Sequence, residues 1–167
     1  GDRFELAIQK SVELGVAEIV PFESERTLVS AADAEKKQAR RRKIAQEAAK
    51  QCGRAIIPTV RDPVLFPDVV SELKASSGLR FLCYEGDGVV PLPKLLVGQA
   101  SPSVVAFAVG PEGGFSAREI DMAREAGIPL CGLGKRILRC ETAPLYVLVA
   151  LAYEFELMRR NLSCELL

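Results

Sequence analysis

The 167-residue sequence contains no histidine and no tryptophan, and its 22 basic and 22 acidic side chains cancel. Without histidine, a zinc site would require four of the five cysteines, which are scattered along the chain without a C-x-x-C pair. A net charge of zero indicates no class of partner. We therefore expect no metal site, and any charge-guided binding must come from local clusters.

Long hydrophobic runs are also missing, as is a recognisable signal peptide. The most apolar long segment, 143–153, meets Glu154 after eleven residues, which is too short to cross a bilayer. Cys83 and Cys131 lie inside apolar runs, as small buried hydrophobic residues do. These features predict a cytoplasmic protein without membrane contact. The chain starts without Met and within a helix-like pattern, so we expect it to be part of a longer protein.

Strand-like apolar runs alternate with helix-like segments along the whole chain. Strands are predicted at 16–22, 55–60, 80–84, 104–109 and 128–133, and helices at 2–15, 30–53, 66–75, 116–126 and from a cap at Thr142 onward. The segment 91–97 is ambiguous. This alternation predicts one α/β domain over 1–167, with a mainly parallel sheet and helices on both faces.

The segment 110–116 joins a predicted strand to a predicted helix. Ser116 and Glu119 have the S-x-x-E spacing of a capping box. Phe115 and Ile120 have the spacing of a hydrophobic staple. The glycines before Ser116 therefore lie at the carboxyl end of a strand and against a helix N-terminus, which is where ligands bind in open α/β sheets.

Two further predicted strands end in glycine-containing turns, at 85–86 and 132–134. A single turn of this kind is more often structural than ligand-binding. The turn at 110–114 lacks the Lys-Ser/Thr that closes a P-loop, and its glycine spacing is not G-x-G-x-x-G. Glycine does allow a ligand to approach the backbone, because it carries no Cβ. The residues alone leave open both a ligand site and a purely architectural role.

The predicted last helix has no polar face between Leu145 and Ala152. A helix that is apolar all round must be buried all round. Because its own sheet can cover only one side, we expect a second copy of the protein to cover the other. Burial within one monomer is the alternative.

Two long motifs make the chain resemble the SPOUT methyltransferases, and in particular the RsmE-type ribosomal RNA small-subunit methyltransferases. The motifs are GPEGGFS at 110–116 and LGKRILRCETA at 133–143, and shorter matches lie at 10–16, 24–26 and 47–54. The resemblance therefore covers most of the chain, up to Arg160.

This resemblance implies the transfer of a methyl group from S-adenosylmethionine to N3 of one uridine in the 16S rRNA of the small ribosomal subunit. It implies an α/β domain with a deep C-terminal trefoil knot, and a homodimer formed through the C-terminal helix and the knot region. It also implies an N-terminal PUA-like RNA-binding domain, which this sequence does not contain. The open alternatives are a SPOUT methyltransferase acting on another RNA, such as tRNA, and a non-enzymatic nucleotide-binding α/β module.

The resemblance further implies that the three glycine-containing turns line one S-adenosylmethionine site. Its three walls would be Leu82, Glu85 and Gly86; Gly110 and Gly114; and Leu133, Gly134, Ile137, Leu138 and Ala143. Backbone groups in the turns would contact the adenine and the ribose.

Methylation at N3 requires the loss of the N3 proton, and the absence of histidine leaves a carboxylate, lysine, tyrosine or cysteine as the base. The candidates beside the turns are Glu112 and Glu141, and Arg139 could stabilise charge on the uracil oxygens. Glu141, at the start of the last helix, is equally a partner for the helix dipole.

Candidates for RNA contact are Arg26, Lys135 and Arg136, all predicted at the carboxyl ends of strands. Eight basic and three acidic residues between 33 and 54 also give a local charge of +5. That helix either contacts phosphates or presents a solvated charged face, and the sequence leaves both open.

Overall fold

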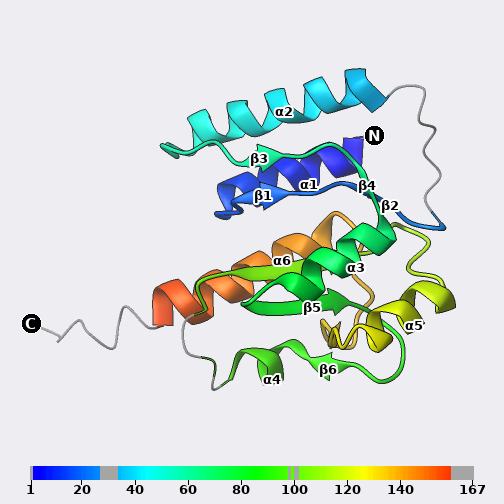
Figure 1. Cartoon of the computed structure of the whole chain (residues 1–167). Helices are drawn as coiled ribbons and strands as arrows, with labels where there is room; N and C mark the ends of the chain where they lie inside the picture. The colour runs from blue at the N-terminus through cyan, green and yellow to red at the C-terminus, as the bar shows by residue number, and fades with distance from the viewer. Residues whose placement is uncertain (1, 27–33, 98, 100–101, 159–167) are drawn as a thin grey trace, which may run out of the picture.

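The computed structural model describes residues 2–26, 34–97, 99 and 102–158. Helices and strands alternate along the chain (Figure 1). In chain order they are α1 (Asp2–Glu13), β1 (Glu18–Ile19), β2 (Phe22–Glu23), α2 (Ala34–Gln51), β3 (Thr59–Val60), β4 (Val64–Leu65), α3 (Phe66–Ala75), β5 (Leu79–Cys83), β6 (Val90–Pro91), α4 (Leu92–Leu96), β7 (Val105–Val109), α5 (Ala117–Glu125), β8 (Leu130–Gly132), α6 (Thr142–Ala152) and the π-helical turn η2 (Tyr153–Leu157).

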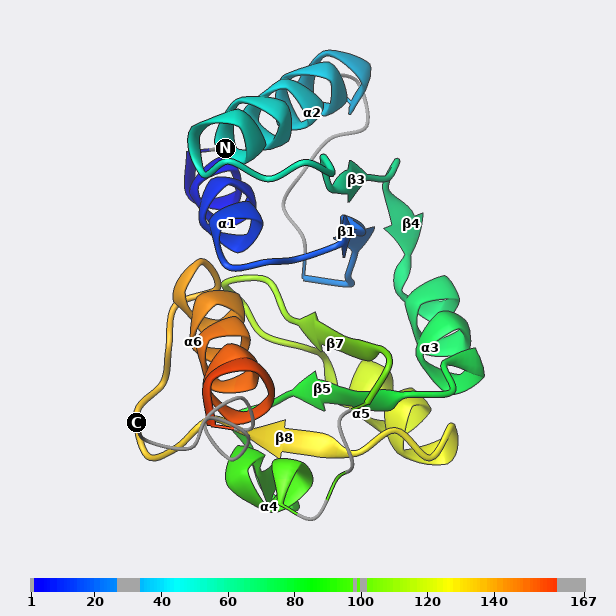
Figure 2. The ribbon, with the colours of Figure 1, turned by 90° about the vertical axis from the view of Figure 1, so that its left-hand side faces the viewer.

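The main sheet has four parallel strands in the order β6-β8-β5-β7. Side chains alternate between its faces, as strand geometry requires. On one face, Leu82, Ala108 and Leu130 pack in a cluster with α3 and α5. On the other, Phe81 and Cys131 pack with α4 and α6 (Figure 2). The predicted α/β class, with a parallel sheet and helices on both faces, is confirmed.

A second layer lies above this sheet and is built from α1, α2, β1 and β3 (Figure 1). Its core contains Ile8 and Val12 of α1 and Ala49 of α2. The Arg54 guanidinium donates to the carbonyls of Val12 and Val16, at 2.9 and 2.7 Å. Helix α1 also contacts α6, so this layer packs on the sheet domain.

The predicted strand at 16–22 is interrupted in the structure. β1 pairs with β3, whereas β2 pairs with β4, and Pro21 lies between them. Proline has no N–H to donate to a ladder, so a change of partner is least costly at this position. The strand predicted at 55–60 shortens to β3, the ambiguous segment 91–97 contains α4, and the start of the helix predicted at 30–53 lies outside the described residues.

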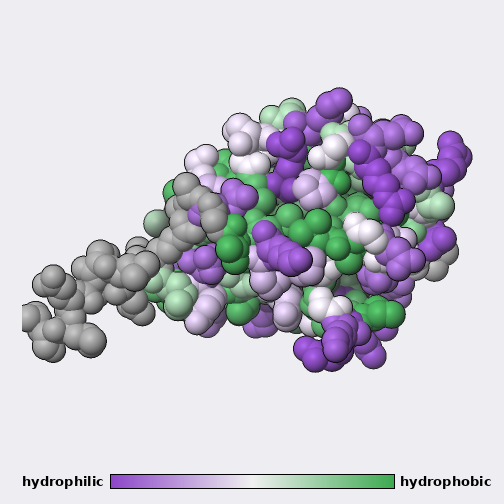
Figure 3. Space-filling view, turned by 90° about the horizontal axis from the view of Figure 1, so that it is seen from below, coloured by the Kyte–Doolittle hydropathy of each residue, from purple (hydrophilic) through white to green (hydrophobic). Residues whose placement is uncertain are grey.

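The last helix differs from its prediction at its start. Thr142 is the first helical residue, and Glu141 occupies the cap position without a side-chain capping bond. The monomer does not bury this helix all round, since Tyr146 is 44% and Val149 is 51% exposed. Hydrophobic side chains also gather in the middle of the face seen from below (Figure 3).

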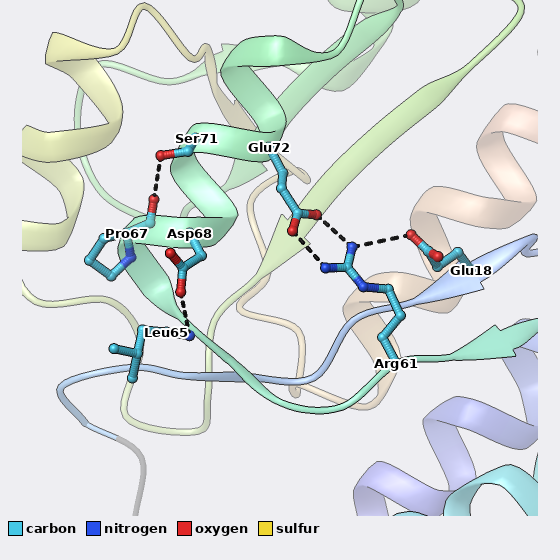
Figure 4. A network of polar contacts seen from close by, with 7 residues as sticks. All are labelled: Glu18, Arg61, Leu65, Pro67, Asp68, Ser71 and Glu72. Atoms are coloured by element: carbon cyan, nitrogen blue, oxygen red, sulfur yellow. Dashed lines mark hydrogen bonds and ion pairs between the residues drawn. The ribbon is translucent and has the colours of Figure 1, made fainter.

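Arg61, between β3 and β4, contacts α3 and β1 (Figure 4). Its guanidinium donates to both carboxylate oxygens of Glu72 on α3, each at 2.8 Å, and lies 3.5 Å from Glu18 on β1. The hydrogen bond to Glu72 raises the pKa of Arg61, and the same contact holds the pKa of Glu72 below its ordinary value. The pair therefore fastens α3 to the segment between β3 and β4.

Acidification should weaken this connection. Because the pKa of Glu72 is lowered on folding, its stabilising contribution is present above the ordinary value of 4.5 and is lost as the pH falls below it. We expect the free energy of unfolding of Glu72→Gln to depend less on pH than that of the parent between about pH 5 and about pH 3, as measured by urea denaturation. The matched control is Glu47→Gln, which removes a carboxylate that lies 3.9 Å from Lys43 within α2. A change of slope as large as that of Glu72→Gln would contradict the role of the pair.

The capping box of α5 should contribute measurably to stability. The Ser116 hydroxyl accepts the backbone N–H of Glu119, so Ser116→Ala should cost about 1 kcal/mol in urea denaturation. Ser71→Ala is the control, because that hydroxyl donates to the Pro67 carbonyl within α3 and caps nothing (Figure 4). Equal losses for the two variants would contradict the capping role.

Candidate functional site

A cavity of about 420 Å³ opens at the carboxyl edge of the main sheet. Strand pairing explains its position: Cys83 lies opposite Val109 on one side and opposite Cys131 on the other, so β5, β7 and β8 end at one level. The turns that follow these three strands form the walls of the cavity.

Most of the predicted site residues line this cavity. They are Glu85, Gly110, Glu112, Gly114, Leu133, Gly134, Arg136, Ile137, Leu138, Arg139, Glu141 and Ala143. All three candidate catalytic residues are thus beside one space, and the three glycine-containing turns meet as predicted.

Four predicted residues lie elsewhere. Leu82 is fully buried between the sheet and the helices α3 and α5, because strand alternation turns its side chain to that face. Gly86 is not among the lining residues, and a Cβ there would lie 2.6 Å from the ring of Tyr84, so its role is to let that ring pack. Lys135 and Arg26 are exposed and outside the lining.

Arg26 contacts the outside of the glycine-rich turn. Its Nη1 donates to the carbonyl of Gly113 at 2.8 Å. The buried carboxylate of Glu119 accepts hydrogen bonds from the N–H of Glu25 and the hydroxyl of Ser24, at 3.0 and 3.1 Å, in addition to the N–H of Ser116. The loop at 24–26 is therefore bound to the start of α5. Through Arg26 it also holds the turn at 110–114, on the side away from the cavity lining.

The glycines allow the walls of the cavity to approach one another. Gly114 has φ +66°, and a Cβ on it would lie 3.0 Å from Glu85 Oε1. A Cβ on Gly132 would lie 2.8 Å from Val89 Cγ2. A larger residue at either position would strain the backbone or displace the neighbouring wall. The close approach of the walls therefore requires glycine here.

Six charged side chains line the cavity, with three of each sign: Arg3, Arg136 and Arg139, and Glu85, Glu112 and Glu141. Arg3 belongs to α1 and forms an ion pair with Glu112. The backbone N–H of Glu141 donates to its own carboxylate and lowers its pKa, and the Cys140 thiol, Arg3 and Arg139 act in the same direction. Glu141 is therefore a weakened base.

Two thiols also line the cavity, and burial raises the pKa of both Cys83 and Cys140. The Cys140 Sγ donates to Glu141 Oε2 at 3.4 Å. Both cysteines are therefore protonated near neutral pH and are unsuitable as bases.

Sequence reasoning missed several lining residues. They are Arg3, Cys83, Tyr84, Val89, Val109, Pro111, Phe115, Gly132 and Cys140. Most adjoin a predicted turn, so extending each turn by one or two residues would have found them. Arg3 has no such signal, because it is 109 positions from its partner Glu112.

A larger groove, of about 1000 Å³, lies between α2 and the segment 57–64. It is far from the glycine-containing turns in the chain, and its charged side chains are already paired, Arg42 with Asp62 and Arg61 with Glu72. The cavity at the sheet edge is the better candidate, because side chains from three turns converge on one space.

Among the described residues, no three His, Cys, Asp or Glu side chains gather in a group that could hold a metal ion. No described helix combines the length and the apolar character needed to span a membrane.

A comparison with known protein families assigns the chain to one of them. The model of the RNA methyltransferase domain matches residues 1–152, which include every wall of the cavity. The chain belongs to this RNA methyltransferase domain family.

Similar proteins with assigned names support the same family. The chain is 36% identical over 165 residues to the ribosomal RNA small subunit methyltransferase E of Bacillus subtilis, and the match covers 95% of this chain and 64% of the relative. It is 36% identical over 147 residues to the enzyme of that name from Mesomycoplasma hyopneumoniae, covering 87% and 62%. The chain thus spans less than two thirds of the length of these relatives.

A solved structure of the same family also matches. The ribosomal RNA small subunit methyltransferase E from Neisseria gonorrhoeae, bound to S-adenosyl methionine, has a TM-score of 0.79 and 38% identity. The match covers 91% of this chain and 61% of that one.

The Glu141 carboxylate should suppress the reactivity of Cys140. After burial, the hydrogen bond to Glu141 and its charge are the next causes of the raised pKa of Cys140, so Glu141→Gln should lower that pKa and increase the thiolate fraction. We expect faster alkylation of Cys140 by iodoacetamide at about pH 8, followed by mass spectrometry of its peptide. Glu112→Gln, whose charge ranks after that of Glu141, should accelerate it less. Unchanged alkylation in Glu141→Gln would contradict the contact.

Proposed function

We propose that this chain is an S-adenosylmethionine-dependent methyltransferase domain that methylates N3 of one uridine in the 16S rRNA of the small ribosomal subunit. The cavity at the three strand ends is the observation that carries the proposal. It lies within the family match, and the relatives named above are small-subunit rRNA methyltransferases.

The residues of the cavity suit this cofactor. A volume of about 420 Å³ is in the range of small-molecule sites. Leu133, Ile137 and Leu138 offer apolar surface for an adenine, and Glu85 offers an acceptor for ribose hydroxyls. Turns that contain glycine expose backbone N–H and C=O groups to a ligand. When bound, the cofactor supplies an electrophilic methyl group on a sulfonium.

The protein must then remove the N3 proton and place N3 in line with that methyl group. The lowered pKa of Glu141 counts against it as the base, so we propose Glu112, which lines the same cavity, for this role. Glu112 lies on the turn that follows β7, and its side chain is 64% exposed, so an entering nucleotide can reach it. Arg139 lines the same space and would stabilise negative charge on the uracil oxygens. Positioning supplies the remaining acceleration.

The RNA would enter across the exposed basic residues beside the cavity. Lys135 and Arg136 lie on the loop after β8, and Arg26 lies beside Gly113. We propose that 1–167 is the methyltransferase domain and that the PUA-like domain of the family supplies further RNA contacts. The basic side chains of α2 could extend the same surface.

A homodimer would complete the site. Ile137 lines the cavity but is 83% exposed, which leaves a large apolar side chain uncovered in one copy. Tyr146 and Val149 on α6, and Tyr153 on η2, are also exposed. These exposed apolar side chains, at the cavity and on the last helix, support dimerisation through the C-terminal region. We also propose the trefoil knot of the family, in which the segment after β8 forms one wall of the cavity.

Cofactor binding is testable with two glycine variants. Gly114→Ala and Gly127→Ala both place a side chain at a positive φ, +66° and +71°, so each should cost about 1–2 kcal/mol of stability. Only Gly114→Ala crowds Glu85, since a Cβ on Gly127 has no heavy atom within 4 Å. In calorimetric titrations with S-adenosylmethionine, we expect weakened binding for Gly114→Ala and parent binding for Gly127→Ala. Failure of the dimeric parent to bind the cofactor would refute the proposal.

Turnover tests the substrate and the base together. With tritiated cofactor, the parent should label small ribosomal subunits and not naked tRNA, and mass spectrometry should place the methyl group on N3 of a uridine. Glu112→Gln should lower kcat about 100-fold or more, in the range of general-base catalysis, and Glu141→Gln should lower it less. Near-normal turnover by both variants would exclude both carboxylates as the base.

A further inference from the structure

Arg3 is the lining residue that comes from outside the sheet domain. It lies in the first turn of α1, whereas all other residues that line the cavity fall between 83 and 143. Its Nη1 donates to Oε1 of Glu112, and its charge is also among the causes that lower the pKa of Glu141. Arg3 therefore lies close to both candidate bases.

This ion pair contributes little to stability. The side chains of Arg3 and Glu112 are 53% and 64% exposed, and water weakens the attraction between exposed charges. Helix α1 is held in place by the buried side chains of Ile8 and Val12. The main effect of the pair is to determine where the Glu112 carboxylate lies.

Glu112 has few other restraints. It lies in a tight turn in which the N–H of Gly114 donates to the carbonyl of Pro111 at 2.8 Å, and this bond fixes the backbone but not the side chain. Among the described residues, Arg3 is the one hydrogen-bonding partner of the Glu112 carboxylate, and it occupies Oε1 only. Oε2 remains available to accept a proton. The next residue, Gly113, is held by Arg26.

We propose that Arg3 is a positioning residue for the reaction: it anchors one oxygen of Glu112 so that the other faces the N3–H of the bound uridine. This inference rests on the function proposed above. The proton passes from N3 to Oε2 of Glu112 and then to solvent, while Arg3 stays charged and bound to Oε1. Helix α1 thereby contributes to the chemistry of a site that the sheet builds.

The test compares Arg3→Gln and Arg3→Lys in the whole protein. Arg3→Gln should lower kcat on small subunits at least about tenfold, because a misplaced catalytic group costs up to about 100-fold. The KM for subunits, the affinity for S-adenosylmethionine and the melting temperature should stay near parent values. Arg3→Lys should recover part of kcat, since an ammonium group can still bind Oε1. Arg118→Gln is the control, because Arg118 lies on α5 outside the cavity lining, in an exposed pair 3.8 Å from Glu25.

A double-mutant cycle separates positioning from direct RNA contact. If Arg3 acts through Glu112, adding Arg3→Gln to Glu112→Gln should cause no further loss of kcat. An equal loss in both backgrounds, a rise in KM without a fall in kcat, or parent turnover by Arg3→Gln would each overturn the inference while leaving the methyltransferase function intact. A parent protein that binds S-adenosylmethionine but methylates no RNA would instead overturn the proposed function, and the inference with it.

Discussion

The in-register parallel pairing of β5 with β7 and β8 is the constraint on which the rest of the structure depends. Because Cys83 lies opposite Val109 and Cys131, three strands end at one level and release their turns at one edge. A shift of register by one residue would exchange the two faces of a strand and separate the ends. The clusters on the two faces, around Leu82 and around Phe81, make such a shift costly.

Residues from the N-terminal part of the chain hold the turn that follows β7. Glu119, although part of a helix cap, also binds the loop at 24–26, and Arg26 and Arg3 contact consecutive residues of the turn after β7. Three polar contacts from residues 3, 25 and 26 thus hold the turn after β7 and the start of α5 in place. Without them, the glycines would leave the turn conformationally free. This explains how a turn with one reactive side chain, Glu112, can have a defined position.

Exposed apolar side chains lie both at the cavity and on the last helix, the region through which we propose that the homodimer forms. Ile137 at the cavity and Val149 on α6 are left uncovered by the monomer, although the sequence around α6 is apolar on all sides. A helix with such a sequence is stable in water only if another surface covers it. The proposed homodimer through the C-terminal region would supply such a surface.

The sequence by itself determined the local structure. The spacing of Ser116 and Glu119 predicted the start of α5, and the apolar runs predicted the strands that carry the three turns. These features depend on residues within a few positions of one another, so they can be read from the chain. The two motifs predicted the family that the comparison shows.

Only the tertiary structure decided which residues reach the site. Arg3 meets Glu112 across 109 positions, and no local pattern records a contact that depends on how α1 packs against the sheet domain. Alternation along β5 buries the side chain of Leu82 on one face of the sheet, whereas the next residue, Cys83, lines the cavity. The break at Pro21 likewise depends on two partner strands forty residues away. Local pattern sets the elements, and long-range packing sets their contacts.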